Sequence, residues 1–310
     1  MLTVLKTALE VGLIYGLVAL ALFISFSILN IADLSTDGCF TLGCAVGAML
    51  TIAGHPILAL FAAMAAGVCS GFVTAFLQTR LGVESIMAGI IVNTGLYTIN
   101  LAVMGFSSNV SITGVDTVFS LFKGLVGGQW SRLILLALIA AVLVLVLIRF
   151  FGTSIGLSIR ATGDSLDMVS ASSINPKATI TIGLCLANAL TALSGCLIGE
   201  YNKFCDINLG TGMVTIALAS LIIGEVFAGR RGSVGKRVVC VVLGSIVYRF
   251  IIALALRLNI SAEYFKLVSA VIVAVAIAAP NMKDYVHLAK IKSNARKLRA
   301  LSGKGDETDA

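Results

Sequence analysis

Apolar residues in this chain are gathered into long runs that short polar turns separate. A helix needs ~20 mostly apolar residues to cross the hydrocarbon core of a bilayer. The second and seventh runs are short, so we expect eight to ten membrane-spanning helices. The best count is nine, near residues 8–29, 37–53, 57–78, 86–105, 132–150, 178–198, 211–228, 238–256 and 263–280.

The composition is that of a protein whose solvent is lipid. Hydrophobic residues make up 58% of the 310 residues and charged residues only 12%, whereas soluble domains carry about 25% charged residues. A water-soluble fold could not cover so much apolar surface with so few charges. We therefore predict an all-α integral membrane protein, with a polytopic membrane domain over residues 1–280 and a charged tail over 281–310.

The positive charges predict the orientation of the chain. They lie between the apolar runs and in the tail rather than along one basic stripe, which favours a topology signal over a nucleic-acid site. Because cytoplasmic segments carry the excess of Lys and Arg, the tail and the loop at 151–177 should be cytoplasmic. Nine crossings then place the N-terminus outside. The tail alone carries Lys283, Lys290, Lys292, Arg296, Lys297, Arg299 and Lys304.

The two short runs follow similar turns, at 31–38 and at 206–212. Short or interrupted helices at matching positions of two halves point to the pathway of a transporter. We therefore expect the first four and the last four spans to be inverted repeats, with the first turn at the cytoplasmic face and the second at the outer face. The alternative is that any two acidic turns that contain glycine resemble each other.

No catalytic or metal-binding motif is found in the sequence. The segment 229–237 resembles a phosphate-binding loop but has Arg230 and Arg237 where that loop needs Gly and Ser or Thr. The seven cysteines form no CxxC pair, and the two histidines are far apart, which disfavours a metal site or a disulfide framework. We expect a non-enzymatic protein with no cofactor of its own, and any ATP must be bound and hydrolysed by another chain.

The loop at 151–177 contains its own short helix. Asp164 or Ser165 can cap its start, and Asn175 with Pro176 ends it. One side of that helix is apolar, so it suits a groove on a partner protein. The alternative, a helix on the bilayer surface, is weakened because the helix lacks a basic polar face.

Several segments, taken in order, resemble one family of transporters. They are Ile159 to Gly163 and Ser173 to Asn175 in the loop, followed by 195–201, 210–213 and 217–225. The chain resembles, over about residues 8–280, the permeases of the branched-chain amino acid and ribose importers of the ATP-binding-cassette type, and is similar to permeases of tryptophan or tyrosine importers. The turn at Asp33-Leu34-Ser35 departs from the amino-acid branch and is similar to that of the sugar branch.

The resemblance implies a set of partners and a substrate class. It implies two permease copies, expected as a homodimer, two cytosolic ATPases and an external solute-binding lipoprotein, in the bacterial inner membrane. The solute would be small and polar, with an aromatic or branched-chain amino acid expected and a sugar or nucleoside as the alternative. The loop would dock on the ATPase through Arg160, Gly163, Asp164, Leu166, Asp167, Met168 and Ala171.

An ion-coupled secondary transporter is the other alternative, but it would need carboxylates deep in the membrane. Polar residues within the spans are candidates for the pathway, because a charge at the membrane centre is costly and marks function by default. Arg249 could instead be structural, with Glu225 as a possible partner. Asn93, Tyr97 and Asn100 share one helix face, either lining a conduit or bonding helix to helix. The pathway candidates are Asn93, Asn188, Arg249, Glu225 and Asp33.

Overall fold

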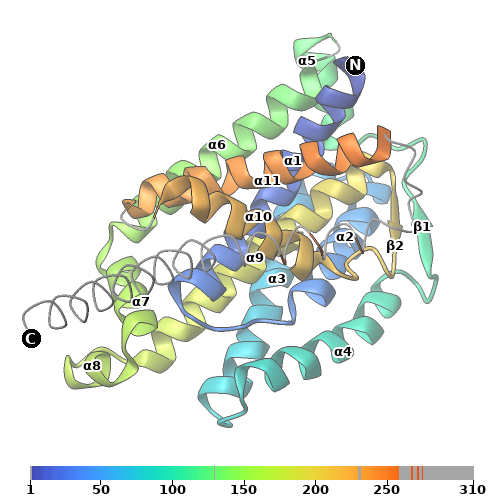
Figure 1. Cartoon of the computed structure of the whole chain (residues 1–310). Coiled ribbons are helices and arrows are strands. Elements are labelled where there is room, and N and C mark those ends of the chain that lie inside the picture. Colours follow the sequence, from blue (N-terminus) through green and yellow to red (C-terminus); the bar gives the residue numbers. More distant parts are fainter. Residues whose placement is uncertain are drawn as a thin grey trace, which may run out of the picture.

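The computed structural model describes residues 2–257 except 129, 230 and 231, together with residues 267, 271 and 274. Nearly all of this part of the chain is helical (Figure 1). The elements are α1 (Leu2–Leu22), η1, a π-helical turn (Phe23–Ile28), α2 (Thr36–Ile52), α3 (Pro56–Thr79), α4 (Ser85–Val103), β1 (Asn109–Ser111), α5 (Val118–Val126), α6 (Ser131–Phe151), α7 (Ser154–Asp164), α8 (Leu166–Ala171), α9 (Pro176–Asn202), β2 (Phe204–Asp206), α10 (Met213–Ala228) and α11 (Val234–Arg257).

The described helices match the predicted runs. Six spans are long and apolar enough to cross a membrane, namely α1 with η1, α3, α4, α6, α9 and α11, while α2 and α10 are shorter apolar helices. These eight correspond to the first eight runs, so the helical membrane architecture is confirmed. The ninth run, 263–280, and the tail, 281–310, lie outside the described residues. The antiparallel pair β1–β2, three residues on each strand, is the one departure from an all-α fold in the described part.

Helices α1 and α9 form the centre of the bundle. Helix α9 packs against α2 and α3, and α1 packs against α10 and α11. Glycines allow this packing: a Cβ on Gly43 would overlap the carbonyl oxygen of Ala192 in α9, and one on Gly12 would lie 3.1 Å from the Cα of Ile246 in α11. Glycine lets the helix backbones approach this closely.

Both short helices begin inside the bundle. After η1 the chain runs over 29–35 without helix or strand and contacts α9, so that Asp33 and Ser35 are buried where α2 begins. After α9 the chain turns back through β2, and α10 begins against α2. The Asp37 carboxylate accepts hydrogen bonds from the backbone N–H groups of Gly212 and Val214, each at 2.9 Å.

The two turns at 31–38 and 206–212 therefore contact each other, and the prediction that they lie at opposite faces is wrong. The reason is the length of the helices that follow them. With 17 residues in α2 and 16 in α10, each helix is about 25 Å long at 1.5 Å per residue, which is less than the ~30 Å hydrocarbon core. The chain reaches the start of α2 through the segment 29–35 and the start of α10 through β2 and the loop 207–212.

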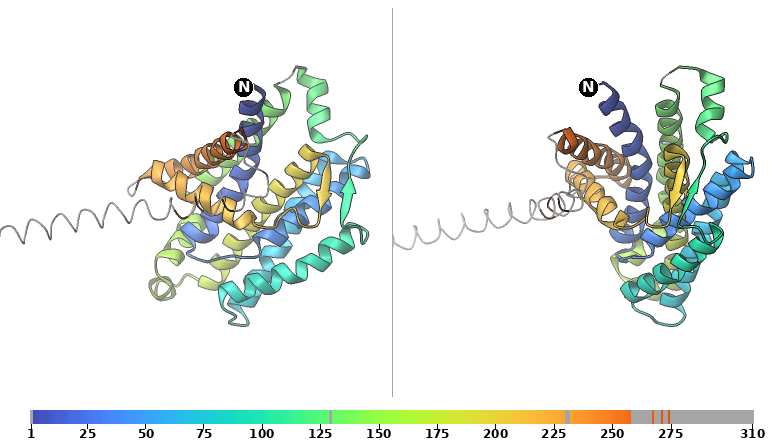
Figure 2. Two further views of the ribbon diagram at one scale, coloured as in Figure 1. Left: turned by 45° about the vertical axis from the view of Figure 1, so that its right-hand side comes forward. Right: turned by 90° about the vertical axis from the view of Figure 1, so that its right-hand side faces the viewer.

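The two ends of the bundle carry different elements (Figures 1 and 2). Helices α7 and α8 lie at one end, and α5 lies at the other, on the same side as the N-terminus. The Lys6 ammonium lies 5.6 Å from the Trp130 ring centroid, which places the start of α1 beside the start of α6. Helix α1 therefore starts at the end opposite the loop that contains α8.

Candidate functional site

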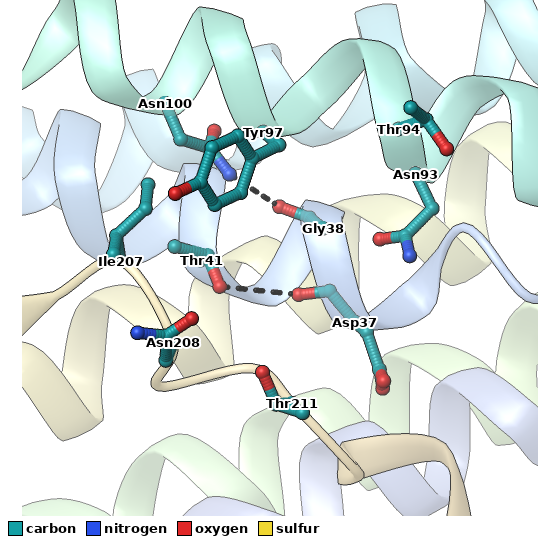
Figure 3. Close-up of a pocket in the computed structure, with 10 residues that line it drawn as sticks. All are labelled: Asp37, Gly38, Thr41, Asn93, Thr94, Tyr97, Asn100, Ile207, Asn208 and Thr211. Carbon is teal, nitrogen blue, oxygen red and sulfur yellow. Dashed lines mark hydrogen bonds between the residues drawn. The ribbon is translucent and has the colours of Figure 1, made fainter.

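A cavity of about 320 Å³ lies where α2 begins, between α2, α4 and the loop that connects β2 to α10 (Figure 3). It is close to the point where the two short helices meet. Most of its lining is polar but uncharged, and Asp37 is the one charged side chain among the described residues that line it. The lining residues are Asp37, Gly38, Thr41, Asn93, Thr94, Tyr97, Asn100, Ile207, Asn208 and Thr211.

Asp37 joins the starts of the two short helices. It belongs to the first turn of α2, and its two carboxylate oxygens each accept one N–H from the start of α10. The N-terminus of a helix carries a partial positive charge, which stabilises an anion placed there. The Thr41 hydroxyl adds a second link, because it accepts the backbone N–H of Gly210 at 3.1 Å. These bonds hold the 207–212 loop against α2.

One face of α4 forms the opposite wall of the cavity. Asn93, Tyr97 and Asn100 all lie on it, so the shared face expected from their spacing is present (Figure 3). Asn100 is almost fully buried and its Nδ2 donates to the Gly38 carbonyl at 3.0 Å. A Cβ on Gly38 would lie 2.6 Å from Asn93 Oδ1 and 3.0 Å from the Leu96 Cβ, so glycine leaves room for these two side chains of α4. Tyr97 is 52% exposed, so α4 presents a polar edge outward.

Asp33 and Asn188 lie in a buried network beside the start of α2. Asn188 Nδ2 donates to one oxygen of the Asp33 carboxylate at 2.9 Å. The backbone N–H and the hydroxyl of Ser35 donate to the other, at 2.8 and 2.6 Å. Both Asp33 and Asn188 are almost fully buried. The network fastens the segment 29–35 to α9, and neither residue is among those that line the cavity.

Glu225 and Arg249 have different contact partners. Glu225 forms an ion pair with Arg237, Oε1 to Nη2 at 2.6 Å, and accepts the Ser27 hydroxyl. The suggested pairing of Glu225 with Arg249 is therefore wrong, because the turn between α10 and α11 brings Arg237 to Glu225 instead. The Arg249 guanidinium lies 3.8 Å from the Tyr15 ring centroid, a cation–π contact.

The loop predicted to be cytoplasmic contains two helices, α7 and α8. Ser165 rather than Asp164 caps α8, with its hydroxyl accepting the Met168 N–H at 3.3 Å. Asn175 caps the next helix, α9, by accepting the Lys177 N–H, so it starts α9 rather than ending α8. Of the seven predicted docking residues, Asp164, Leu166, Asp167, Met168 and Ala171 are exposed, while Arg160 and Gly163 are half-buried.

The loop also contacts the core of the bundle. A Cβ on Gly163 would overlap the carbonyl oxygen of Ile28, the last residue of η1. The hydroxyl groups of Thr162 and Thr179 lie 2.8 Å apart and tie α7 to α9. Movement of α7 would therefore press on the backbone that leads to the segment 29–35 and α2.

A metal site is not apparent in the described part of the chain, where no group of three or more His, Cys, Asp or Glu side chains could hold an ion. The main features of the site are the cavity, the paired starts of α2 and α10, and the exposed helix α8. Their chemistry is hydrogen bonding and helix packing. Such an arrangement can bind a polar solute and move helices around it.

Comparison with known proteins identifies relatives along the whole chain. The family model of permease components of branched-chain amino acid transport systems matches residues 4–277. A tyrosine transport system permease protein of Clostridioides difficile is 30% identical over 94% of this chain and 95% of its own length. An uncharacterized protein of Rickettsia prowazekii is 30% identical over 91% of this chain and 99% of its own length. No solved structure matches the chain.

Proposed function

The chain belongs to the family of branched-chain amino acid transport permease components, and we propose that it forms the translocation pathway of an ATP-driven amino acid importer. The observation that carries this proposal is the meeting of the starts of two short helices, α2 and α10, at a polar cavity inside the bundle. In transporters, discontinuous helices whose N-termini face the membrane interior commonly form the solute site. Here the starts of α2 and α10 are joined by Asp37 beside the cavity.

We infer inverted repeats from the way the helices pack. Suppose that α1, α2 and α3 correspond to α9, α10 and α11. The contact of α1 with α11 then matches that of α9 with α3, and the contact of α2 with α3 matches that of α10 with α11. Helix α4 would then correspond to the predicted ninth span at 263–280, outside the described residues. Repeats of this kind rock against each other around a central site.

The proposed energy source is a separate pair of cytosolic ATPases, which bind the ATP, so the permease itself needs no cofactor. Helix α8 supports this, because Leu166 and Met168 are 52% and 65% exposed at its surface and suit an apolar groove. With α8 in the cytoplasm, the N-terminus lies outside. The positive charges of the tail support a cytoplasmic C-terminus, and the proposed location is the bacterial inner membrane.

The proposed substrate is an amino acid, delivered by an external binding lipoprotein. Two findings support it: one relative is a tyrosine transport permease by name, and the cavity of about 320 Å³ is at the lower end of the size range of small-molecule sites. We favour an aromatic amino acid for the same reasons.

A second copy of this chain is the proposed partner within the membrane. Helix α4 exposes Thr94 and Tyr97 beside the cavity. Exposed polar groups of a spanning helix face protein or a watery space rather than lipid. A homodimer that meets near this edge would cover them and would place the two cavities beside a shared pathway.

Purification from the native membrane tests the proposal. A tagged chain extracted in mild detergent should bring with it an ATPase and a solute-binding lipoprotein, identified by mass spectrometry. Leu166→Arg should release the ATPase but not prevent membrane insertion. The matched control is Val126→Arg in α5, a site with nearly equal exposure, 51%, at the other end of the bundle; it should leave the ATPase bound. A wild-type chain that is isolated with no ATPase in several detergents would contradict the proposal.

A further inference from the structure

The lining of the cavity combines hydroxyl and amide groups, which can donate or accept, with one carboxylate, that of Asp37. Asp37 supplies the charge, and each of its oxygens accepts one backbone N–H from the start of α10. A carboxylate has about four acceptor positions, so about two remain for another donor. The carboxylate is therefore held in place by the protein but not saturated by it.

The charge of the lining determines which group binds at Asp37. The described residues that line the cavity include no Lys, Arg or His, so this lining offers no charged partner to a carboxylate. An ammonium group has three N–H donors and no acceptor, and its bonds to a carboxylate are charge-assisted and strong. We propose that the cavity binds the primary ammonium group of the transported solute at Asp37.

This inference rests on the proposed function, because it assigns the solute-recognising group of the same pathway. It goes further in giving the permease itself a preference for amines, separate from any selection by an external binding protein. The competing role for Asp37 is purely structural, as a cap for α10. A cap alone would produce no discrimination between solutes with and without an ammonium group.

Competition binding with the permease–ATPase complex in nanodiscs, without any external binding protein, tests the assignment. The radiolabelled probe is L-tyrosine, and the competitors are tyramine, which lacks the carboxylate, and 3-(4-hydroxyphenyl)propanoate, which lacks the ammonium group. Tyramine should compete about as well as tyrosine. The deaminated acid should compete at least ~10-fold more weakly, because it cannot form the charge-assisted pair with Asp37. Equal competition by the deaminated acid would overturn the assignment, as would the absence of binding by either amine at millimolar concentration.

Two variants link the preference to Asp37. Asp37→Asn removes the charge and keeps one acceptor oxygen, so tyramine and the deaminated acid should then compete within ~2-fold of each other. Asp206→Asn is the matched control: Asp206 also accepts a backbone N–H, from Asn208 at 2.8 Å, but does not line the cavity, and the preference for amines should persist. An unchanged preference in Asp37→Asn would overturn the assignment. If that variant does not assemble, the wild-type competition decides.

Failure of this inference is distinguishable from failure of the proposed function. A complex that contains its ATPase and imports solute, but binds amines and deaminated acids equally, would refute only the role of Asp37. A chain with no ATPase partner would refute the importer itself. Binding that depended on sodium concentration instead of on the ammonium group would assign the carboxylate to a cation and would also overturn the inference.

Discussion

Replacing Gly163 with alanine tests whether α7 has to stay in contact with η1. The added Cβ would overlap the Ile28 carbonyl oxygen and would lie 2.8 Å from the Ile28 carbonyl carbon and 3.0 Å from the Leu29 Cα. All three atoms belong to the backbone, so no side chain can rotate away to relieve the clash. Either α7 or the end of η1 has to move.

The size of the effect follows from two opposing contributions. Alanine is favoured over glycine in a helix by ~1 kcal/mol, whereas an extra methyl group in a tightly packed site costs ~1–3 kcal/mol. Because the clash is with backbone atoms, we expect the upper part of that range and a net loss of about 1–2 kcal/mol in docking of α7. Such a loss lowers the ratio of docked to undocked α7 about 5–30-fold.

The assay is ATP-driven uptake in vesicles together with ATP hydrolysis by the same complex. Gly163→Ala should reduce the solute imported per ATP hydrolysed several-fold, because the ATPase would push on a loop that no longer presses on η1. The control is Gly95→Ala in α4, where no other atom lies within 4 Å of the added Cβ; uptake per ATP should stay at the wild-type value. If Gly163→Ala matched this control, the contact between α7 and η1 would have no part in coupling.

Three further substitutions test other contacts. Asp33→Ala leaves two donors of Ser35 and one of Asn188 without their buried acceptor. Because hydrogen bonds to a charged group contribute ~1.5–3 kcal/mol each, the variant should unfold at a clearly lower temperature in detergent. An unchanged unfolding midpoint would refute the role of this network. Glu225→Gln weakens a part-exposed ion pair, for which ~1 kcal/mol or less is expected; a large drop in thermal stability would show that the pair contributes more than its exposure suggests. Arg249→Ala should impair transport while the ATPase still co-purifies, and normal uptake would leave Arg249 a packing role against Tyr15.

The order and type of the elements could be predicted from the sequence because lipid imposes long apolar runs. The predicted runs near 57–78 and 132–150 match α3 and α6 to within a few residues. Hydropathy along the chain is a local property, and no partner elsewhere is needed to recognise it. The two short runs likewise match the shorter helices α2 and α10, which begin near the polar turns that precede those runs.

The arrangement of the cavity could not be predicted, because it depends on contacts between distant parts of the chain. Asp37 bonds to Gly212 and Val214, about 175 residues away, and no local pattern marks that contact. The pairing of Glu225 with Arg237 likewise depends on how the chain folds back between α10 and α11, which spacing along the sequence does not show. The face of α4 with Asn93, Tyr97 and Asn100 was visible in the spacing, but its neighbours were not.

Uptake into proteoliposomes tests the central claim most directly. The permease is reconstituted with its co-purified ATPase and binding protein, and radiolabelled L-tyrosine is added outside while ATP is enclosed within. We predict uptake that requires ATP in the lumen and the external binding protein, and that persists when ionophores abolish all ion gradients. Uptake driven by an imposed proton or sodium gradient in the absence of ATP would contradict the account and would make the chain an ion-coupled transporter.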